Sequence, residues 1–423
     1  MSDAVEAILS LAWTDVPDPV RSRLASLTSD FGAVCVAGRV TETARIAADH
    51  AGAEHPGEAA TALLDGRRLA ATGAAFANGV LANALDFDDG HRLVKGHPGA
   101  NVIPAALAAA ETAGGDRDDL LAAVAVGYEV ALRAGMHLHA ASGEYHASGA
   151  WGSVGAAAAA ARLLGLNPDQ TRHALGLAGY HAPIAPIMRS VADPAMTKDA
   201  CGWGASVGVS SALLASRGFT ALAGDFLATD IGERWHLLDV YVKKFPCCRW
   251  SHPAIEAALD LRAEAELDIE RIARIRLRTF AAAAAIACGV PVTTEQAQYS
   301  LVWPVAVALA HGRFAVEHVL PPAFADGAPR HLLELVDVEV DPTFESEFPA
   351  RRRSSLTIET EDGLRYESGP RESPGEPDDP RWQEIVDAKS AAYPDDLLFA
   401  RGRPWSNAAR ARLRSRSSRP RRP

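Results

Sequence analysis

Residues 149–166 read GAWGSVGAAAAAARLLGL, and this stretch decides which fold the chain can form. Its first turns carry mostly small side chains, which lets the backbones of neighbouring helices approach closely. From residue 3 to about residue 240 the surrounding sequence is rich in Ala and Leu, with apolar residues at i, i+3 and i+4 spacing between Gly, Pro and Asp. This pattern predicts a pack of amphipathic helices around one central, buried helix.

After about residue 238 the spacing of apolar residues changes. Residues 272–280 (IARIRLRTF) and 336–340 (VDVEV) alternate apolar and polar side chains, as half-buried strands do. Residues 355–369 (SLTIETEDGLRYESG) predict a hairpin that turns at Glu361, Asp362 and Gly363. A helical stretch between these strands makes this part of the chain a smaller unit of mixed structure.

The predicted fold class is therefore mainly α, with a large all-helical domain over residues 1–239 and a smaller α+β lid domain over residues 240–381. A Pro- and acid-rich connector ends the lid, and residues 382–404 are expected to pack back on the helical domain. Residues 405–423 form a basic tail that we expect to be disordered, because charged low-complexity termini are usually solvated. Binding of RNA or of an acidic surface is the alternative for this tail.

Composition narrows the classes of protein and of partner. The 423 residues are 48% hydrophobic and 22% charged, as in globular chains, with a net charge of -11 that disfavours nucleic acid as a partner. An acidic N-terminus and the lack of a long uninterrupted apolar run predict a cytoplasmic protein that does not bind membranes. No C-x-x-C pair, Walker loop or G-x-G-x-x-G motif occurs, so we expect no disulfide framework, cluster or nucleotide cofactor.

The densest group of ionisable residues falls in one connection between two helical patterns. It comprises Asp86, Asp88, Asp89, His91, Lys95 and His97. So many titratable groups in one loop indicate a functional site, although a helix-capping loop would also use Asp, Gly and Pro here. A metal site is a further alternative, but no H-x-x-x-H or C-x-x-C pattern accompanies the cluster, and no metal is predicted.

Three further segments carry candidate residues. His146 stands just before the small-residue helix, where a helix N-terminus favours an anion, and Lys198 lies in a Gly- and Ala-rich segment that permits close approach of a ligand. Lys243, Lys244, Arg249 and His252 gather at the predicted domain junction, a common place for ligand clefts. Only five of the 42 basic residues are lysines, so a lysine indicates a need for a compact, tunable charge. Together, the candidate histidines, lysines and aspartate suit binding of carboxylates and transfer of protons without a cofactor.

These segments, in this order, resemble the MmgE/PrpD family, which includes 2-methylcitrate dehydratases, cis-aconitate decarboxylases and an iminodisuccinate epimerase. The likeness rests on ANG-x4-ALDFDD from residue 77, H-P at 97, Y-H at 145, T-K at 197, K-x-F-P-C-C-R-W-x-H-P-A-I from 243 and AQYS-x3-P-V-A-x-AL from 297. The resemblance implies a large helical domain, a smaller α+β lid and a homodimer.

By the same resemblance, the active-site positions of the decarboxylase branch fall on Asp86, His97, His146, Lys198 and Lys243. The two histidines become acid/base candidates and the lysines carboxylate holders; the substrate-binding candidates are Lys243, Lys244, Arg249, Tyr299 and Trp303. Two positions depart from the decarboxylases, since Trp303 replaces a Tyr and Gly90 replaces a Thr. Tyr299, one helical turn before Trp303, could supply a hydroxyl on the same face.

The expected function is that of a cofactor-free, dehydratase-type lyase acting on a small polycarboxylate. One histidine would remove a proton α to a carboxylate, and a second would protonate the departing hydroxyl. Decarboxylation of the cis-aconitate type and epimerisation of a dicarboxylate are alternatives that use the same site. A non-catalytic carboxylate-binding or scaffold homologue is the alternative from another class.

Overall fold

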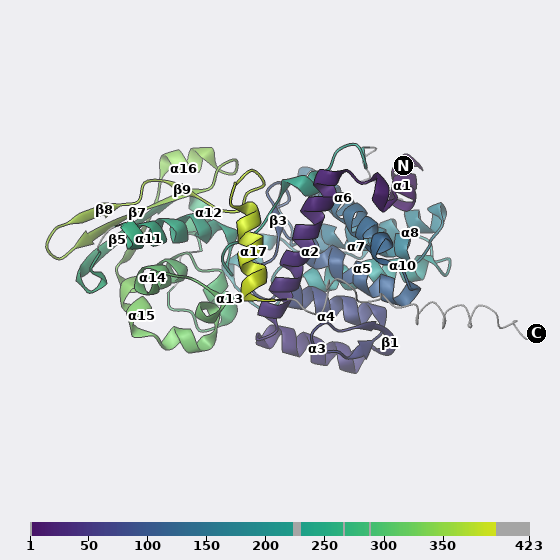
Figure 1. Ribbon diagram of the computed structural model, residues 1–423, viewed down its shortest axis with the longest axis horizontal. Coiled ribbons are helices and arrows are strands. Elements are labelled where there is room, and N and C mark those ends of the chain that lie inside the picture. The colour runs from purple at the N-terminus through teal and green to yellow at the C-terminus, as the bar shows by residue number, and fades with distance from the viewer. Residues whose placement is uncertain (1, 223–229, 265–266, 287–288, 395–423) are drawn as a thin grey trace, which may run out of the picture.

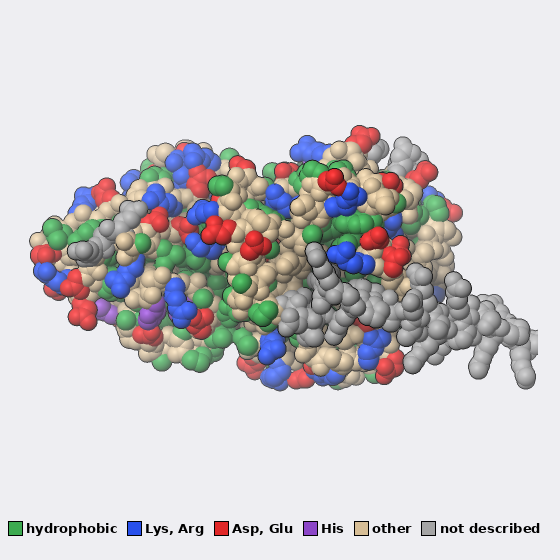
Figure 2. All heavy atoms as spheres, in the orientation of Figure 1, with side chains coloured by type: hydrophobic (Ala, Val, Ile, Leu, Met, Phe, Trp, Pro, Cys, Tyr) green, Lys and Arg blue, Asp and Glu red, His purple; other side chains and the backbone are tan. Residues whose placement is uncertain are grey.

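The computed structural model describes residues 2–222, 230–264, 267–286 and 289–394, so residues 395–404 and the basic tail of 405–423 lie outside the described part. Figure 1 shows an elongated molecule with helices of the N-terminal half in one lobe and the larger sheet in the other. On the face drawn in Figure 2, basic and acidic side chains are interspersed on both lobes. The fold is mainly α with a smaller α+β part, as the sequence predicted.

The N-terminal lobe is a pack of helices. They are α1 (Ser2–Ser10), α2 (Asp18–Gly38), α3 (Glu42–Glu54), α4 (Ala71–Asn83), α5 (Gly99–Ala113), α6 (Arg117–Ser142), α7 (Gly149–Leu163), α8 (Pro168–Tyr180), α9 (Ile187–Ala192) and α10 (Cys201–Ala215). The lobe also contains a two-stranded ladder of β1 (Pro56–Thr61) and β2 (Arg68–Leu69), which the helical spacing did not predict. The sequence of β1, PGEAAT, lacks the apolar alternation that marks a strand.

Helix α7 is the centre of this pack, because it contacts α5, α6, α8 and α10. The small residues predicted to permit close packing do so: a Cβ built at Gly155 would lie 2.3 Å from the Gly127 carbonyl oxygen on α6, and one built at Gly208 would lie 2.4 Å from Ala156 Cβ. Larger side chains at these contacts would push the helices apart.

Helix α6 is the one described helix whose length and composition would allow it to cross a membrane. However, 89% of its most apolar 18-residue window is buried inside the protein, against α5 and α7. It therefore serves as a core helix of this lobe.

The C-terminal lobe combines a sheet with helices. Its elements are α11 (His252–Glu264), β5 (Ile272–Thr279), α12 (Ala281–Ala284), α13 (Thr294–Gln298), α14 (Val302–His311), α15 (Gly327–Glu334), β6 (Val336–Val340), α16 (Pro342–Glu347), β7 (Arg353–Thr360), β8 (Arg365–Glu367) and β9 (Arg371–Glu372). The sheet order is β6-β5-β7-β8, with β5 and β6 parallel and the other pairs antiparallel. The predicted hairpin is confirmed as β7–β8, and Gly363 takes a φ of +82° in its turn.

A C-terminal helix and a short ladder are among the contacts that join the lobes. Helix α17 (Trp382–Ala392) lies against α2 of the N-terminal lobe (Figure 1), and Lys389 Nζ pairs with Asp30 Oδ1 at 2.6 Å in a buried position. A short ladder of β3 (Gly90–His91) and β4 (Val240–Tyr241) ties the loop after α4 to the junction segment. This ladder brings the predicted site residues of the two segments close together.

Candidate active site

The two segments that carry site residues of the N-terminal lobe contain strained backbone conformations. Asp86 and Lys95, in the loop between α4 and α5, have φ values of +50° and +47°, and Lys198 and Ala200, before α10, have +41° and +54°. These are four of the five residues other than glycine with positive φ in the described part of the chain. Such conformations cost about 1–3 kcal/mol each and are retained mainly where surrounding structure enforces them, often at functional sites.

Carboxylates surround the ring of His97 in this loop. Its Nε2 lies 3.2 Å from Asp86 Oδ1 and 3.9 Å from Asp199 Oδ2, and its Nδ1 lies 3.2 Å from Asp88 Oδ2 and 2.8 Å from the Asp89 carbonyl oxygen. Burial opposes the charge, but the Asp88 carboxylate, with Asp199 and Asp86, holds the pKa of His97 well above its usual value. His97 is therefore an imidazolium at neutral pH.

Asp86 also forms a buried ion pair across the junction. Lys243 Nζ lies 2.7 Å from Asp86 Oδ1 and donates to the Asp86 carbonyl oxygen at 2.9 Å. Burial would raise the pKa of Asp86, but Lys243 and then His97 hold it well below its usual value; burial likewise opposes the charge of Lys243, but Asp86 raises its pKa. Both groups remain charged, and the pair fixes the loop against the junction segment.

A third carboxylate, Asp199, completes this arrangement and was not predicted from the sequence. Its Oδ1 accepts from Ser148 Oγ at 2.8 Å and its Oδ2 accepts from Tyr299 Oη at 3.1 Å. Burial raises the pKa of Tyr299 well above its usual value, so its hydroxyl stays protonated and can donate. The only signal for Asp199 was its place directly after Lys198, in a motif that we interpreted for its lysine.

These groups meet at a cavity of about 170 Å³ between the lobes. Its wall includes Asp86, Lys95, His97, Tyr145, Asp199, Tyr241, Lys243, Cys248, Arg249, Trp250, Tyr299, Phe348 and Arg352. The cavity thus combines an imidazolium, a neutral phenol and several cations, a set that can hold carboxylates and deliver a proton.

Lys198 and His146 are near this cavity but do not line it. Lys198 is 4% exposed, its Nζ donates to Gln298 Oε1, and burial lowers its pKa. His146 is buried and stacks on His139, and its Nδ1 has no hydrogen-bond partner within the described residues. The structure therefore places one histidine, His97, in the cavity wall, whereas two were predicted to serve there.

Three predicted substrate-binding residues have other partners within the protein. Lys244 pairs with Glu256 at 2.6 Å and lines a different cavity, of about 390 Å³, between α11 and α17. Trp303 is fully buried in the C-terminal lobe, where its indole Nε1 donates to the His318 carbonyl oxygen at 2.9 Å. Arg249 reaches the cavity wall, but its guanidinium pairs with Glu376 at 3.0 Å. Substrate binding by Lys244 and Trp303 is therefore not supported by their positions.

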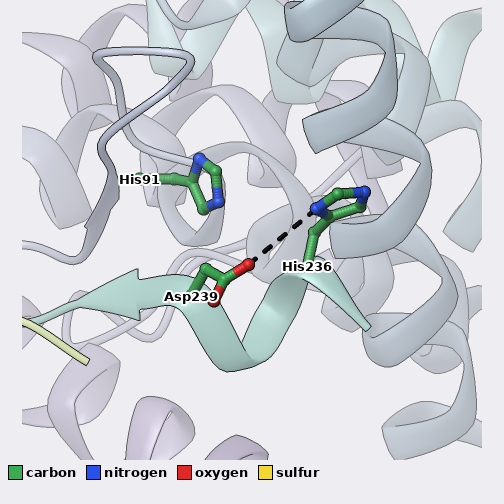
Figure 3. A group of neighbouring side chains, drawn as sticks. All are labelled: His91, His236 and Asp239. Carbon is green, nitrogen blue, oxygen red and sulfur yellow. Dashed lines mark ion pairs between the residues drawn. The ribbon is translucent and has the colours of Figure 1, made fainter. Parts of the chain in front are cut away.

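A second group of titratable residues lies outside the cavity wall. Figure 3 shows His91 from β3 facing His236 and Asp239 from the 3-10 helix His236–Asp239, with His236 Nδ1 4.0 Å from Asp239 Oδ2. One ligand atom from each lies within 4.8 Å of the others, and burial lowers the pKa of His91 to about 4. Zinc ligands bind at about 2.0–2.2 Å, so the three side chains would have to draw together to hold an ion. Asp86, Asp88 and His97 are similarly close, but Lys243 already pairs with Asp86.

Comparisons with known proteins agree with this architecture. Residues 3–246 match the MmgE/PrpD N-terminal domain, and residues 245–399 match the MmgE/PrpD C-terminal domain. The chain is 28% identical over 285 residues to the cis-aconitate decarboxylase-like protein oryM of Aspergillus oryzae, covering 59% of each chain. It is 32% identical over 244 residues to cis-aconitate decarboxylase of Homo sapiens, covering 50% of each. The matched part thus spans 50–59% of the length of these relatives. With both domain models matched along its length, the chain belongs to the MmgE/PrpD family.

Proposed function

We propose that the protein is a lyase that decarboxylates a small unsaturated polycarboxylate of the cis-aconitate type. The observation that carries this proposal is the imidazolium of His97, held charged by three carboxylates in the wall of a cavity that also contains cationic side chains. Curated relatives described as cis-aconitate decarboxylases support the same class of reaction.

The chemistry follows from the positions of the charges. When the carbon–carboxylate bond breaks, the electron pair stays on carbon and CO2 leaves. Cations near the cavity stabilise the carbanion through the remaining carboxylates. The Nδ1 side of His97 is held by Asp88 and the Asp89 carbonyl, whereas its Nε2 faces Asp86 and Asp199, which both line the cavity. Nε2 is thus the atom that donates the proton to carbon, and solvent restores it afterwards.

Dehydration is the second candidate, and one contact favours it. A dehydratase needs a base as well as an acid, and the Asp199 carboxylate, 3.9 Å from His97 Nε2, could accept the α-proton while His97 protonates the leaving hydroxyl. The two-histidine version predicted from the sequence is less well supported, because His146 does not line the cavity.

The test is incubation of the full chain with cis-aconitate, 2-methylcitrate, citrate and iminodisuccinate in separate reactions, followed by proton NMR in D2O. Release of CO2 with deuterium on the product carbon is expected for cis-aconitate. His97→Gln is expected to lower turnover by about 100-fold or more, since a positioned proton donor contributes about 10²–10⁴. His311→Gln is the matched control, because His311 pairs with Asp326 away from the cavity. Release of water from a hydroxy acid without CO2 would favour dehydration instead.

A further inference from the structure

Two cations in the cavity wall have no carboxylate partner. Neither Lys95 nor Arg352 forms an ion pair within 4.0 Å of any acid in the described part of the chain, whereas Lys243 pairs with Asp86 and Arg249 with Glu376. The uncompensated positive charge of the cavity is therefore concentrated on these two side chains.

Lys95 is held in place by aromatic rings. Its Nζ lies 3.5 Å from the centre of the Tyr145 ring and 4.9 Å from that of Phe348, and both rings line the cavity. Its backbone is one of the strained positions, with φ at +47°. The aromatic faces position the ammonium, yet they leave its hydrogen-bond donors without an acceptor that would fully satisfy them.

Arg352 stands in a run of three arginines, and only the middle one turns toward the cavity. Arg351 pairs with Glu372 and Arg353 with Glu347. Arg352 is 6% exposed, its one described hydrogen bond is a 3.5 Å contact from Nη2 to the Arg92 carbonyl oxygen, and its Nε has no partner within the described residues. A buried guanidinium with free donors is costly unless an anion binds it.

The two cations line the same cavity, on whose wall Phe348 also stands beside the Lys95 ammonium. Burial, and then the charge of Arg352, lower the pKa of Lys95 to about 8. A guanidinium offers a planar fork that matches a carboxylate, and an ammonium adds a compact point charge. A carboxylate bound between them would offset both positive charges and accept hydrogen bonds from the free donors of the ammonium and the guanidinium.

We propose that Lys95 and Arg352 form a subsite for the substrate carboxylate that is remote from the reacting carbon. The inference rests on the proposed function for the identity of the ligand as a polycarboxylate. The subsite selects acids with an additional carboxylate, while His97 and its neighbours act on the reacting end of the same molecule.

The test is calorimetric titration of the full chain with tricarballylate, an inert tricarboxylate, with succinate and with inorganic phosphate. Lys95→Gln and Arg352→Gln are each expected to weaken tricarballylate binding by at least about tenfold, the loss of one charge-assisted contact. The preference for tricarballylate over succinate should shrink in both variants. Arg351→Gln, which changes the outward neighbour, should bind tricarballylate as the wild type does, and circular dichroism should show that all variants are folded.

Several results would overturn the subsite. The tricarballylate titration does so if binding is absent from the wild type, if it is unchanged in Lys95→Gln and Arg352→Gln, or if it falls by the same factor as succinate binding. A carboxylate subsite would also be rejected if phosphate bound more tightly than tricarballylate and if the variants lost more affinity for phosphate than for tricarballylate.

Failure of the proposed function gives a different result. If no acid is turned over but the variants still lose tricarballylate affinity, the lyase proposal fails and the subsite stands. If cis-aconitate is decarboxylated with the same KM in Arg352→Gln as in the wild type, the subsite fails and the lyase proposal stands.

Discussion

Replacing Lys243 by Met should destabilise the protein more than a typical substitution, because it leaves the Asp86 carboxylate buried without its main partner. Asp86 is 2% exposed and Lys243 is 1% exposed, and they contact at 2.7 Å. Breaking one side of a buried ion pair costs about 3–5 kcal/mol. His97, 3.2 Å from the same carboxylate oxygen, remains as a partial partner, so we expect a loss of about 3 kcal/mol, at the lower end of this range.

The double variant Asp86→Asn/Lys243→Met separates the pair from its surroundings. Without the buried carboxylate, the missing ammonium no longer leaves a charge unpaired, so the double variant should be no less stable than Lys243→Met alone. Urea unfolding of the wild type, both single variants and the double variant gives the coupling free energy, provided that the m-values agree. Turnover should stay low in the double variant, because both residues line the cavity.

Additive losses would refute this reasoning. If the double variant loses the sum of the two single losses, within about 0.5 kcal/mol, the two side chains do not stabilise each other.

Three other outcomes are expected. Lys198→Arg and Lys198→Ala should each lower turnover by about 100-fold, because Lys198 Nζ holds Gln298, which directly precedes Tyr299 of the cavity wall, and a small displacement there misplaces the reacting groups; steady-state kinetics in which Lys198→Arg retains more than about a third of the activity would contradict this. Burial and the charge of Arg352 lower the pKa of Lys95 to about 8. The kcat/KM of the wild type should therefore fall as pH rises through this value, because Lys95 loses its proton. The kcat/KM of Lys95→Arg should stay level to about pH 9. Tyr180, Ile184 and Trp203 are 74%, 53% and 51% exposed, and we expect a second copy of the chain to cover them; light scattering should give a dimer mass that Trp203→Glu lowers, and a wild-type monomer would contradict it.

The helical part of the fold could be predicted because its signal is local. Apolar spacing and small residues in 149–166 are enough to indicate a central helix, and α7 occupies that place. The hairpin β7–β8 likewise follows from alternation around Gly363. Contacts between distant segments carry no such signal, so Asp199, which meets Tyr299 across 100 residues of sequence, was missed.

Local spacing also failed where the chain changes direction. Tyr299 and Trp303 were expected on one helical face, but α13 ends at Gln298 and α14 begins at Val302, so the spacing of four residues does not apply. Tyr299 consequently reaches the cavity and Trp303 enters the core. Similarly, adjacent Lys243 and Lys244 line two different cavities, because the chain bends at Lys244 directly after Lys243.

The ladder between β3 and β4 also restricts how this sequence can vary. A Cβ at Gly90 would lie 2.4 Å from Tyr241 Oη, and Tyr241 is itself 3% exposed beneath the guanidinium of Arg249. A threonine at position 90 therefore competes for the volume that this tyrosine fills. We therefore expect a threonine at position 90 of this chain to be tolerated only together with a smaller residue at position 241.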